Sequence, residues 1–224
     1  MAVSGAISGQ KSQENGFSAF LPTPERHNQK GGKMKRIKGT QTEKNLLQAF
    51  AGESQARNRY TFFASKAKKE GFMQISAIFS ETADQEKEHA ERFFKFLEGG
   101  PLEITAVFPA GVIGSTEENL SAAAAGEYEE WHDLYPAFAA KAREEGLECV
   151  AAAFEAVCVS ERNHEHRYRK LLENLKNNHV FSRQEEKVWK CRNCGYLHKG
   201  KEAPEMCPAC IHARSYFEIL AENW

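Results

Sequence analysis

The sequence contains no apolar run of the length, about 18 residues, that a membrane-spanning helix needs. It has no excess of charge of either sign, since its formal net charge is −1, and so it offers no broad electrostatic attraction for nucleic acid or anionic lipid. It also lacks a glycine-rich loop of the kind that cradles the phosphates of a nucleotide. We therefore expect a soluble protein with no membrane or nucleic-acid partner and no nucleotide-binding loop of its own.

Residues 1–33 lack the apolar periodicity found in the rest of the chain. They are rich in Gly, Ser, Gln and Lys, with Pro22 and Pro24 in the middle, and such a composition buries too little apolar surface to order a chain. They also lack the apolar core of a secretory signal and are not clearly arginine-rich and acid-poor. We expect a disordered leader or tag before an original start at Met34, and a cytoplasmic protein; organelle targeting stays an alternative.

Four later segments have apolar residues at steps of three and four, which predicts four amphipathic helices. The expected helices cover about residues 42–69, 73–98, 115–145 and 147–176, and Pro136 should bend the third. In each helix, acids interrupt the apolar stripe where core residues belong. Two of these acids are followed three residues later by a histidine. The full set is Glu53, Glu86 with His89, Glu127 with Glu130, and Glu161 with His164.

The placement of these acids predicts a metal centre. Moving one ionised carboxylate into a core costs several kcal/mol even after relaxation, so five facing one interior would unfold the chain unless cations lay between them. Residues three apart on a helix project from the same side, so the two side chains of each Glu-x-x-His pair can reach one metal. A lone Glu-x-x-His is often only a surface ion pair, but two in register indicate a site that two iron ions would neutralise.

An internal repeat supports this interpretation. From Glu53 to Glu86 is 33 residues and from Glu127 to Glu161 is 34, and the segments KAKKEG and KAREEG occupy equivalent places in the two halves. One helical hairpin has been used twice. Two single glutamates with two Glu-x-x-His pairs form the known ligand pattern of ferritin-like di-iron and di-manganese bundles. We therefore expect a mainly α protein with a ferritin-like four-helix bundle over residues 34–178.

The C-terminal part carries a second set of metal ligands. Two Cys-x-x-Cys pairs can each wrap a tight turn around one metal and give a tetrahedral four-sulfur site, which suits zinc and iron equally. Disulfides are the other possibility, but a segment this short, with so little core, favours a metal. We expect a linker at 179–186 and a small metal-stapled domain at 187–224, and we interpret Cys149 and Cys158 as buried free thiols. The four ligands are Cys191, Cys194, Cys207 and Cys210.

With both ligand sets in this order, residues 34–224 resemble the rubrerythrin family. The tail, with WKCRNCGY, CPAC and flanking aromatics, resembles the rubredoxin domain of that family, which implies iron at the four cysteines. The resemblance implies that four glutamates lie between or beside two irons and that His164 binds one of them. It implies that Glu130 and His89 are alternative ligands of the other iron, and that Tyr60 and Tyr135 hydrogen-bond core carboxylates. The four glutamates are Glu53, Glu86, Glu127 and Glu161.

The resemblance also implies a function: a non-haem di-iron peroxidase that reduces hydrogen peroxide to water in defence against oxidative stress. Electrons would be relayed through the four-cysteine iron. The expected partners are hydrogen peroxide, an electron-donating reductase linked to NAD(P)H or a rubredoxin, and further copies of the chain in a homodimer or higher homo-oligomer. A ferroxidase or iron-handling protein is one alternative, and a structural helical module with a zinc ribbon is the other.

Overall fold

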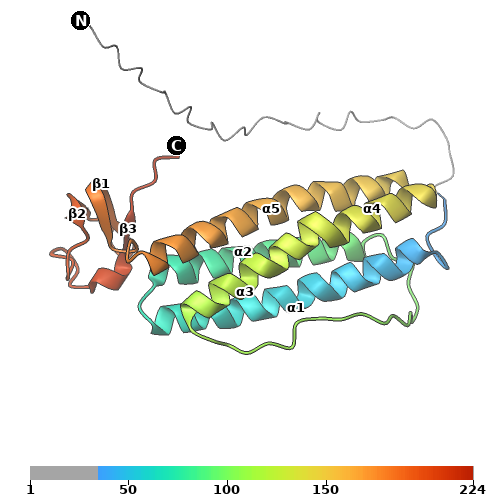
Figure 1. The fold of residues 1–224 in the computed structure, drawn as a ribbon, viewed down its shortest axis with the longest axis horizontal. Coiled ribbons are helices and arrows are strands. Elements are labelled where there is room, and N and C mark those ends of the chain that lie inside the picture. The colour runs from blue at the N-terminus through green and yellow to red at the C-terminus, as the bar shows by residue number, and fades with distance from the viewer. Residues whose placement is uncertain (1–34, 224) are drawn as a thin grey trace, which may run out of the picture. The chain divides into compact units, whose positions relative to one another are not determined.

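A bundle of long helices makes up most of the chain (Figure 1). The computed structural model describes residues 35–223, so the expected leader at 1–33 and the expected start at Met34 lie outside the described residues. The mainly helical fold confirms the predicted fold class. Within residues 35–223, no helix is long and apolar enough to cross a membrane. The helical elements of the bundle are α1 (Gln41–Lys69), α2 (Met73–Phe94), α3 (Thr116–Glu129), η1 (Glu130–Leu134), α4 (Tyr135–Glu144) and α5 (Glu148–Lys176).

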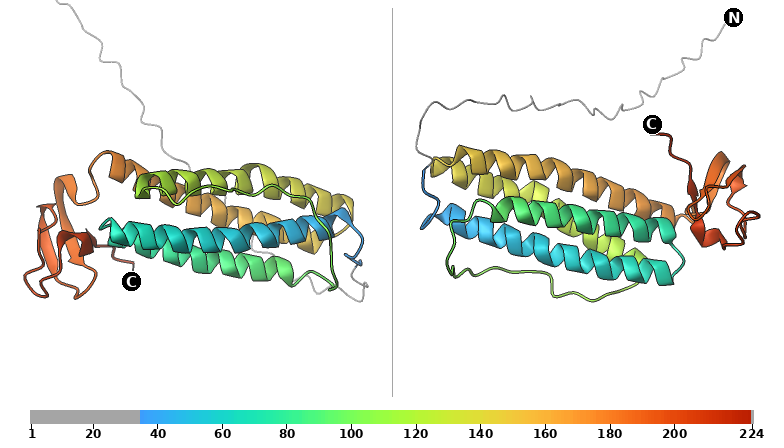
Figure 2. Two further views of the ribbon diagram at one scale, coloured as in Figure 1. Left: turned by 90° about the horizontal axis from the view of Figure 1, so that it is seen from below. Right: turned by 180° about the vertical axis from the view of Figure 1, so that it is seen from behind.

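Two helical hairpins form the bundle, as the internal repeat predicts. Helix α1 packs along α2, while α3 and α4 pack along α5. Each hairpin turns at a glycine with a left-handed backbone, Gly71 at φ 85° and Gly146 at φ 71°, a conformation that glycine adopts at little cost. Between the hairpins, a long connection runs back along the bundle from the end of α2 to the start of α3 (Figures 1 and 2). At its end, Ser115 and Glu118 form a capping box that starts α3.

The second helix is shorter than expected. It ends at Phe94, and the residues that follow form a turn instead of continuing to residue 98. In that turn the carboxylate of Glu98 accepts a hydrogen bond of 2.7 Å from the backbone N–H of Ile37. This bond fastens the chain that enters α1 to the chain that leaves α2, and a positive φ at Gly99 then turns the backbone away.

The third helix is interrupted rather than bent. A five-residue π-helical turn, η1, separates α3 from α4, and the N–H of Tyr135 donates to the carbonyl of Glu130, five residues back. Pro136 follows immediately: it has no N–H, and its ring would clash with the carbonyl four residues before it in a regular α-helix. The wider turn accommodates the proline, and turns of this kind are frequent at functional sites. Glu130, one of the predicted ligands, is the first residue of η1.

Two apolar clusters make up the core of the bundle, and the acids lie between them along the helices. In α5, Phe154 belongs to one cluster and Tyr168 to the other, and Glu161 and His164 fall between them in the sequence. The same order occurs in α1, where Glu53 lies between Leu46 and the second cluster. Burying one such large side chain stabilises a fold by about 1.5–3 kcal/mol. The acids thus sit in a polar layer with apolar packing on both sides.

The tail forms a small antiparallel sheet with strand order β2-β1-β3. Its core contains Trp189 and Phe217, both almost fully buried. Strand β1 begins at Ser182, so its first five residues fall within the segment 179–186 that was expected to be a linker. The elements of the tail are β1 (Ser182–Cys191), β2 (Leu197–Glu202), the short 3₁₀ helix η2 (Arg214–Tyr216) and β3 (Phe217–Ile219).

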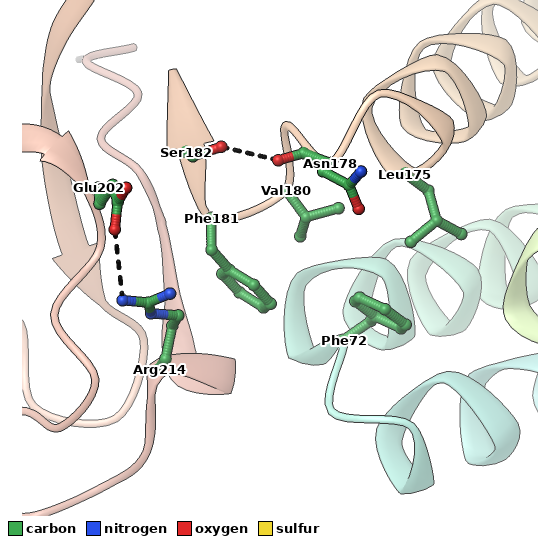
Figure 3. Close-up of a pocket in the computed structure, with 8 residues that line it drawn as sticks. All are labelled: Phe72, Leu175, Asn178, Val180, Phe181, Ser182, Glu202 and Arg214. Atoms are coloured by element: carbon green, nitrogen blue, oxygen red, sulfur yellow. Dashed lines mark hydrogen bonds and ion pairs between the residues drawn. The ribbon is translucent and has the colours of Figure 1, made fainter. Parts of the chain in front are cut away.

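A cavity of about 320 Å³ lies where the chain leaves α5 for the sheet (Figure 3). Phe72, from the turn between α1 and α2, stacks on Phe181 with ring centroids 6.2 Å apart. Arg214 also lines this cavity. Its walls are mostly apolar and bring together no group of metal ligands, so within the described residues the metal centres lie elsewhere.

The two cysteines of α5 were both expected to be buried free thiols. Cys158 is half-buried, but Cys149 is exposed, because it lies in the first turn of α5, at the end of the bundle.

Candidate metal centres

The polar layer of the bundle gathers side chains from every long helix. Glu53 comes from α1, Glu86 and His89 from α2, Glu127 from α3, and Glu161 and His164 from α5. The four glutamates are each at most 1% exposed and His164 is 3% exposed. Such burial of acids is rare unless the charges are paired or bind a metal.

These side chains form two groups of possible ligands that share two members. The donor atoms within each group lie within 4.8 Å of one another. Glu86 and Glu161 belong to both groups, and Glu130 belongs to neither. The geometry therefore provides two adjacent metal positions with two carboxylates between them. The first group is Glu53, Glu86, His89 and Glu161, and the second is Glu86, Glu127, Glu161 and His164.

The spacing of the donor atoms is that of a coordination sphere. His164 Nδ1 is 2.8 Å from Glu161 Oε2, 3.1 Å from Glu86 Oε1 and 3.3 Å from Glu127 Oε2. A single ring nitrogen cannot donate its one proton to three carboxylates. Donors about 2.1 Å from one ion, in contrast, lie about 3 Å from each other. His89 Nδ1 repeats the pattern at 2.8 Å from Glu161 Oε1 and 3.1 Å from Glu86 Oε2.

Several buried oxygens in the layer have no hydrogen-bond donor. Glu53 Oε2 is inaccessible to solvent and has no hydrogen-bond partner, and the two oxygens of Glu161 are close to His89 Nδ1 and His164 Nδ1 but not in the geometry of a good hydrogen bond. A buried acceptor left in this state costs about 1–3 kcal/mol, and more when it is charged. These oxygens point to cations as their missing partners, and the mixed oxygen and nitrogen donor set fits iron.

The pKa values of the glutamates and histidines also indicate that the layer lacks positive charge. Burial, together with the neighbouring carboxylates, raises the pKa of Glu53 and of Glu127 well above the ordinary value. Burial alone would lower the pKa of the histidines, but hydrogen bonds to the glutamates outweigh it and raise the pKa to about 10 at His89 and about 12 at His164. Without metal, the layer retains protons as its counter-charge.

Two buried tyrosines hydrogen-bond the two glutamates that belong to only one group each. Tyr60 OH donates to Glu127 Oε1 at 2.5 Å, and Tyr135 OH donates to Glu53 Oε1 at 2.5 Å. Each bond leaves the second carboxylate oxygen free to face a metal. Burial and the adjacent carboxylates raise the pKa of both phenols, so both remain donors at neutral pH.

Two residues that contact this layer were not predicted from the sequence. Gln85 Oε1 lies 3.0 Å from His164 Nε2, and Arg167 donates to the same oxygen. Both are half-buried and lie at the edge of the apolar stripe of their helix. Only the pairing of α2 with α5 in three dimensions brings them to the histidine.

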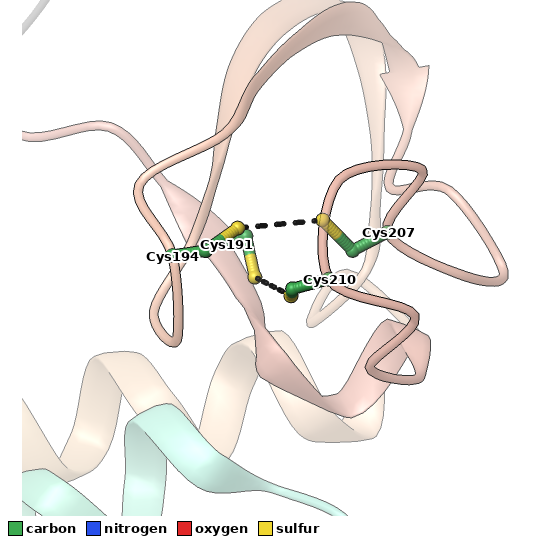
Figure 4. Close-up of side chains that lie close together, drawn as sticks. All are labelled: Cys191, Cys194, Cys207 and Cys210. Atoms are coloured by element: carbon green, nitrogen blue, oxygen red, sulfur yellow. Dashed lines mark hydrogen bonds between the residues drawn. The ribbon is translucent and has the colours of Figure 1, made fainter.

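The four cysteines of the tail form the second centre (Figure 4). The Sγ atoms of Cys191 and Cys210 are 3.7 Å apart, and those of Cys194 and Cys207 are 3.6 Å apart. Sulfurs about 2.3 Å from a central ion form tetrahedron edges close to this length. A backbone N–H bond from His212 lowers the pKa of Cys210 to about 6, which favours the thiolate that binds metal.

Each pair of cysteines is held by the same turn. The N–H of Gly195 donates to the carbonyl of Cys191, and the N–H of Ile211 donates to the carbonyl of Cys207, both at 2.9 Å. Both donors have a left-handed backbone, at φ 79° and 62°. That conformation suits glycine but is costly for a β-branched residue such as isoleucine. A turn held against such a cost indicates that the position of the second pair of sulfurs matters.

The fold and the two centres together define a ferritin-like di-iron protein with a rubredoxin-type tail. Residues 44–172 match the family model described as Rubrerythrin, and residues 189–218 match that described as Rubrerythrin, rubredoxin-like domain. The chain belongs to the rubrerythrin family. The di-iron site and the four-cysteine site of that family are both present, as predicted.

Individual relatives agree along nearly the whole described chain. Rubrerythrin of Porphyromonas gingivalis is 63% identical over 190 residues, which cover 85% of this chain and 95% of the relative. Rubrerythrin of Nitratidesulfovibrio vulgaris is 58% identical over 191 residues, 85% of this chain and all of the relative. Among solved structures, nigerythrin in a partially reduced state superposes with a TM-score of 0.56 at 30% identity, covering 91% of this chain and 98% of that chain.

Proposed function

We propose that this chain is a non-haem di-iron peroxidase that reduces hydrogen peroxide to water. The observation that carries the proposal is the pair of ligand groups that share Glu86 and Glu161, because shared carboxylates hold two metals side by side. Two adjacent irons supply, when bound, the two electrons that one O–O bond requires. The reaction takes up two protons and two electrons for each hydrogen peroxide and gives two waters.

The protein's own residues prepare the site for this chemistry. Tyr60 and Tyr135 hold one oxygen of Glu127 and of Glu53, so the other oxygen is presented to the metals in a fixed direction. The apolar clusters on both sides keep bulk water out of the layer and strengthen every electrostatic interaction within it. His89 is half-buried, so this end of the layer is the more open to a small substrate.

The ligand set suits the reduced site in particular. Glu130 lies outside both groups, while His89 lies within one. Four carboxylates then face the metal positions, and their charge balances two ferrous ions. A fifth carboxylate would suit the greater charge of two ferric ions. We therefore keep Glu130 and the neutral His89 as alternative ligands that exchange when the site changes oxidation state.

Electrons would reach the bundle through the four-cysteine iron, a one-electron centre. Cys194 is exposed, while Cys191 and Cys207 are buried, so one edge of this centre is open to a donor. The proposed donor is a separate reductase linked to NAD(P)H, or a rubredoxin. A homodimer or higher homo-oligomer arranged head to tail would bring the tail of one chain close to the bundle of another, and the cytoplasm is the proposed compartment.

The test compares oxidants on protein reduced without air. Hydrogen peroxide, added in equal amount to the di-iron sites, should oxidise them at once, and dioxygen should act much more slowly. The matched control, Glu129→Gln, changes an exposed acid of α3 and should behave like the unaltered chain. Faster oxidation by dioxygen, with added ferrous iron consumed as substrate, would contradict the proposal and favour a ferroxidase.

A further inference from the structure

The two histidines of the polar layer are held differently. Both direct Nδ1 at the glutamates. The second ring nitrogen of His164, Nε2, lies 3.0 Å from Gln85 Oε1. In the part of the chain that the structure describes, Nε2 of His89 has no hydrogen-bond partner. His164 is therefore held at both ring nitrogens, whereas His89 is held only at Nδ1.

Gln85 is itself fixed by an arginine on the neighbouring helix. Arg167 Nη2 donates to Gln85 Oε1 at 3.4 Å and to Thr82 Oγ1 at 2.6 Å. Its Nη1 donates to Glu81 Oε1 at 2.5 Å. The three acceptors lie within about one turn of α2, while Arg167 and His164 both lie on α5. The contacts therefore tie the two helices together behind the metal-facing side.

The direction of the bonds shows that Nε2 of His164 carries a hydrogen. A guanidinium group can only donate, so the side-chain atom of Gln85 that faces Arg167 must be the amide oxygen. That oxygen can only accept, and therefore Nε2 of His164 carries the hydrogen. When the ring gives up its other proton to bind a metal, its lone pair is therefore at Nδ1, and Nδ1 is the atom that faces Glu127 and Glu161.

We propose that Gln85, clamped by Arg167, is the positioning residue that fixes the tautomer and ring orientation of His164. The proposal rests on the proposed function only in taking His164 as a metal ligand. His164 is then the permanent histidine of the site, whereas His89, without such an anchor, is free to leave its metal. The two metal positions therefore differ because Gln85 and Arg167 hold His164 and no equivalent pair holds His89 in the described chain.

A carbonyl acceptor behind a metal-binding imidazole raises the basicity of the imidazole and holds the ring in place. Loss of such a partner lowers metal affinity by about 10-fold to 100-fold. The amide of Gln85 is neutral and is shared with a cation, so it orients the ring without removing the proton from Nε2. Leucine at this position would keep the bulk of the side chain and remove the acceptor; glutamate would keep the acceptor.

The experiment uses the full chain loaded with zinc as a diamagnetic probe of the bundle site. Three variants are compared: Gln85→Leu, Gln85→Glu, and Gln74→Leu as a control on the same helix. Zinc affinity is measured by competition with a chelator, with the tail zinc common to all samples. The Nε2 proton of His164 is followed by its ¹H–¹⁵N correlation, a signal that would not respond to a loss of packing alone.

Gln85→Leu should lower the affinity of one bundle zinc by about 10-fold to 100-fold and expose the Nε2 proton to rapid exchange with water. Gln85→Glu should restore both, and Gln74→Leu should change neither. The proposal is overturned if Gln85→Leu binds zinc as tightly as the parent chain, because the acceptor is then not needed. It is also overturned if Gln85→Glu loses as much affinity as Gln85→Leu, because keeping the acceptor then makes no difference. If His164→Ala leaves two zinc ions bound in the bundle, the site assignment itself has failed, which is a different result.

Discussion

Glu86 and Glu161 present one carboxylate oxygen to each of the two histidines. Glu86 Oε2 and Glu161 Oε1 lie 3.1 Å and 2.8 Å from His89 Nδ1. Their other oxygens lie 3.1 Å and 2.8 Å from His164 Nδ1. Each glutamate therefore spans both metal positions in the same way, and the layer has an approximate twofold symmetry that follows the repeat of the hairpins. This relationship distinguishes a pair of bridged metals from two separate sites.

The first prediction concerns this bridging role. Glu161→Ala removes a donor from both positions, so both metals should be lost from the bundle, whereas Glu53→Ala should leave one metal bound. Elemental analysis per chain, with Glu129→Gln as the control, measures the difference. Equal loss of metal in the two variants would argue against the bridge.

The tyrosines provide a second prediction. Tyr60→Phe and Tyr135→Phe each delete a hydrogen bond to a buried carboxylate, which should cost about 1.5–3 kcal/mol in the metal-loaded protein. The two effects should add, because the tyrosines bond different glutamates. Tyr168→Phe is the matched control, since Tyr168 is also buried but its hydroxyl has no hydrogen-bond partner in the described chain. Urea unfolding compares the parent, the three single variants and the Tyr60→Phe/Tyr135→Phe double variant, and a loss at Tyr168 as large as at Tyr60 would refute the assignment.

The third prediction tests the tail as an electron relay. Cys194→Ser replaces a soft sulfur ligand by oxygen and should nearly abolish peroxide reduction driven by a reductase. The same variant, once its di-iron site has been reduced chemically, should still react with peroxide at the normal rate. Cys149→Ser serves as the control, because Cys149 is exposed and lies outside both centres. If Cys194→Ser impairs both assays equally, the tail does not act as a relay.

The fourth prediction concerns pH. In the metal-free protein the pKa of His89 is raised from 6.5 to about 10, and that of His164 from 6.5 to about 12. Burial opposes these shifts, but hydrogen bonds to the glutamates outweigh it. A group whose pKa is higher in the folded than in the unfolded protein contributes its full stabilisation below the unfolded-state pKa. That stabilisation is lost as the pH rises through the folded-state pKa. Metal-free protein should therefore lose stability above about pH 6.5, and the raised pKa of Glu53 and Glu127 acts in the same direction.

Urea unfolding of the metal-free and metal-loaded chains across this pH window checks the sign. The metal-loaded protein should have a much flatter profile, since the metals replace the protons as counter-charge. Metal-free protein that becomes more stable as the pH rises from neutral would show that the histidines are not held by the glutamates.

The sequence predicted those features of the site that depend on the periodicity of a single helix. The spacing of Glu86 and His89, and of Glu161 and His164, follows from helical periodicity alone, and so does their place in an apolar stripe. The interruption at η1 was harder to foresee, because a proline in a helix can produce a bend or a widened turn, and the packing of α3 and α4 against α5 decides between them. The position of Glu130 outside both ligand groups is a result of that packing.

Contacts between helices explain the features that the sequence did not reveal. Gln85 and Arg167 lie at the edge of the apolar stripes, where helical periodicity predicts no role for them, and only the contact with His164 across the two helices gives them one. Ile211 carries no turn signal, yet it adopts the left-handed backbone that Gly195 adopts in the equivalent turn. The turn that brings Cys207 and Cys210 together requires this conformation, and local propensity does not predict it.

The most direct test of the whole account is the metal content and visible spectrum of the full chain, before and after anaerobic reduction and after one equivalent of hydrogen peroxide. The account predicts about three irons per chain, two in the bundle and one at the four cysteines. It also predicts a red colour that bleaches on reduction and returns promptly with peroxide. A colourless protein that holds one zinc in the tail and no metal in the bundle would contradict it.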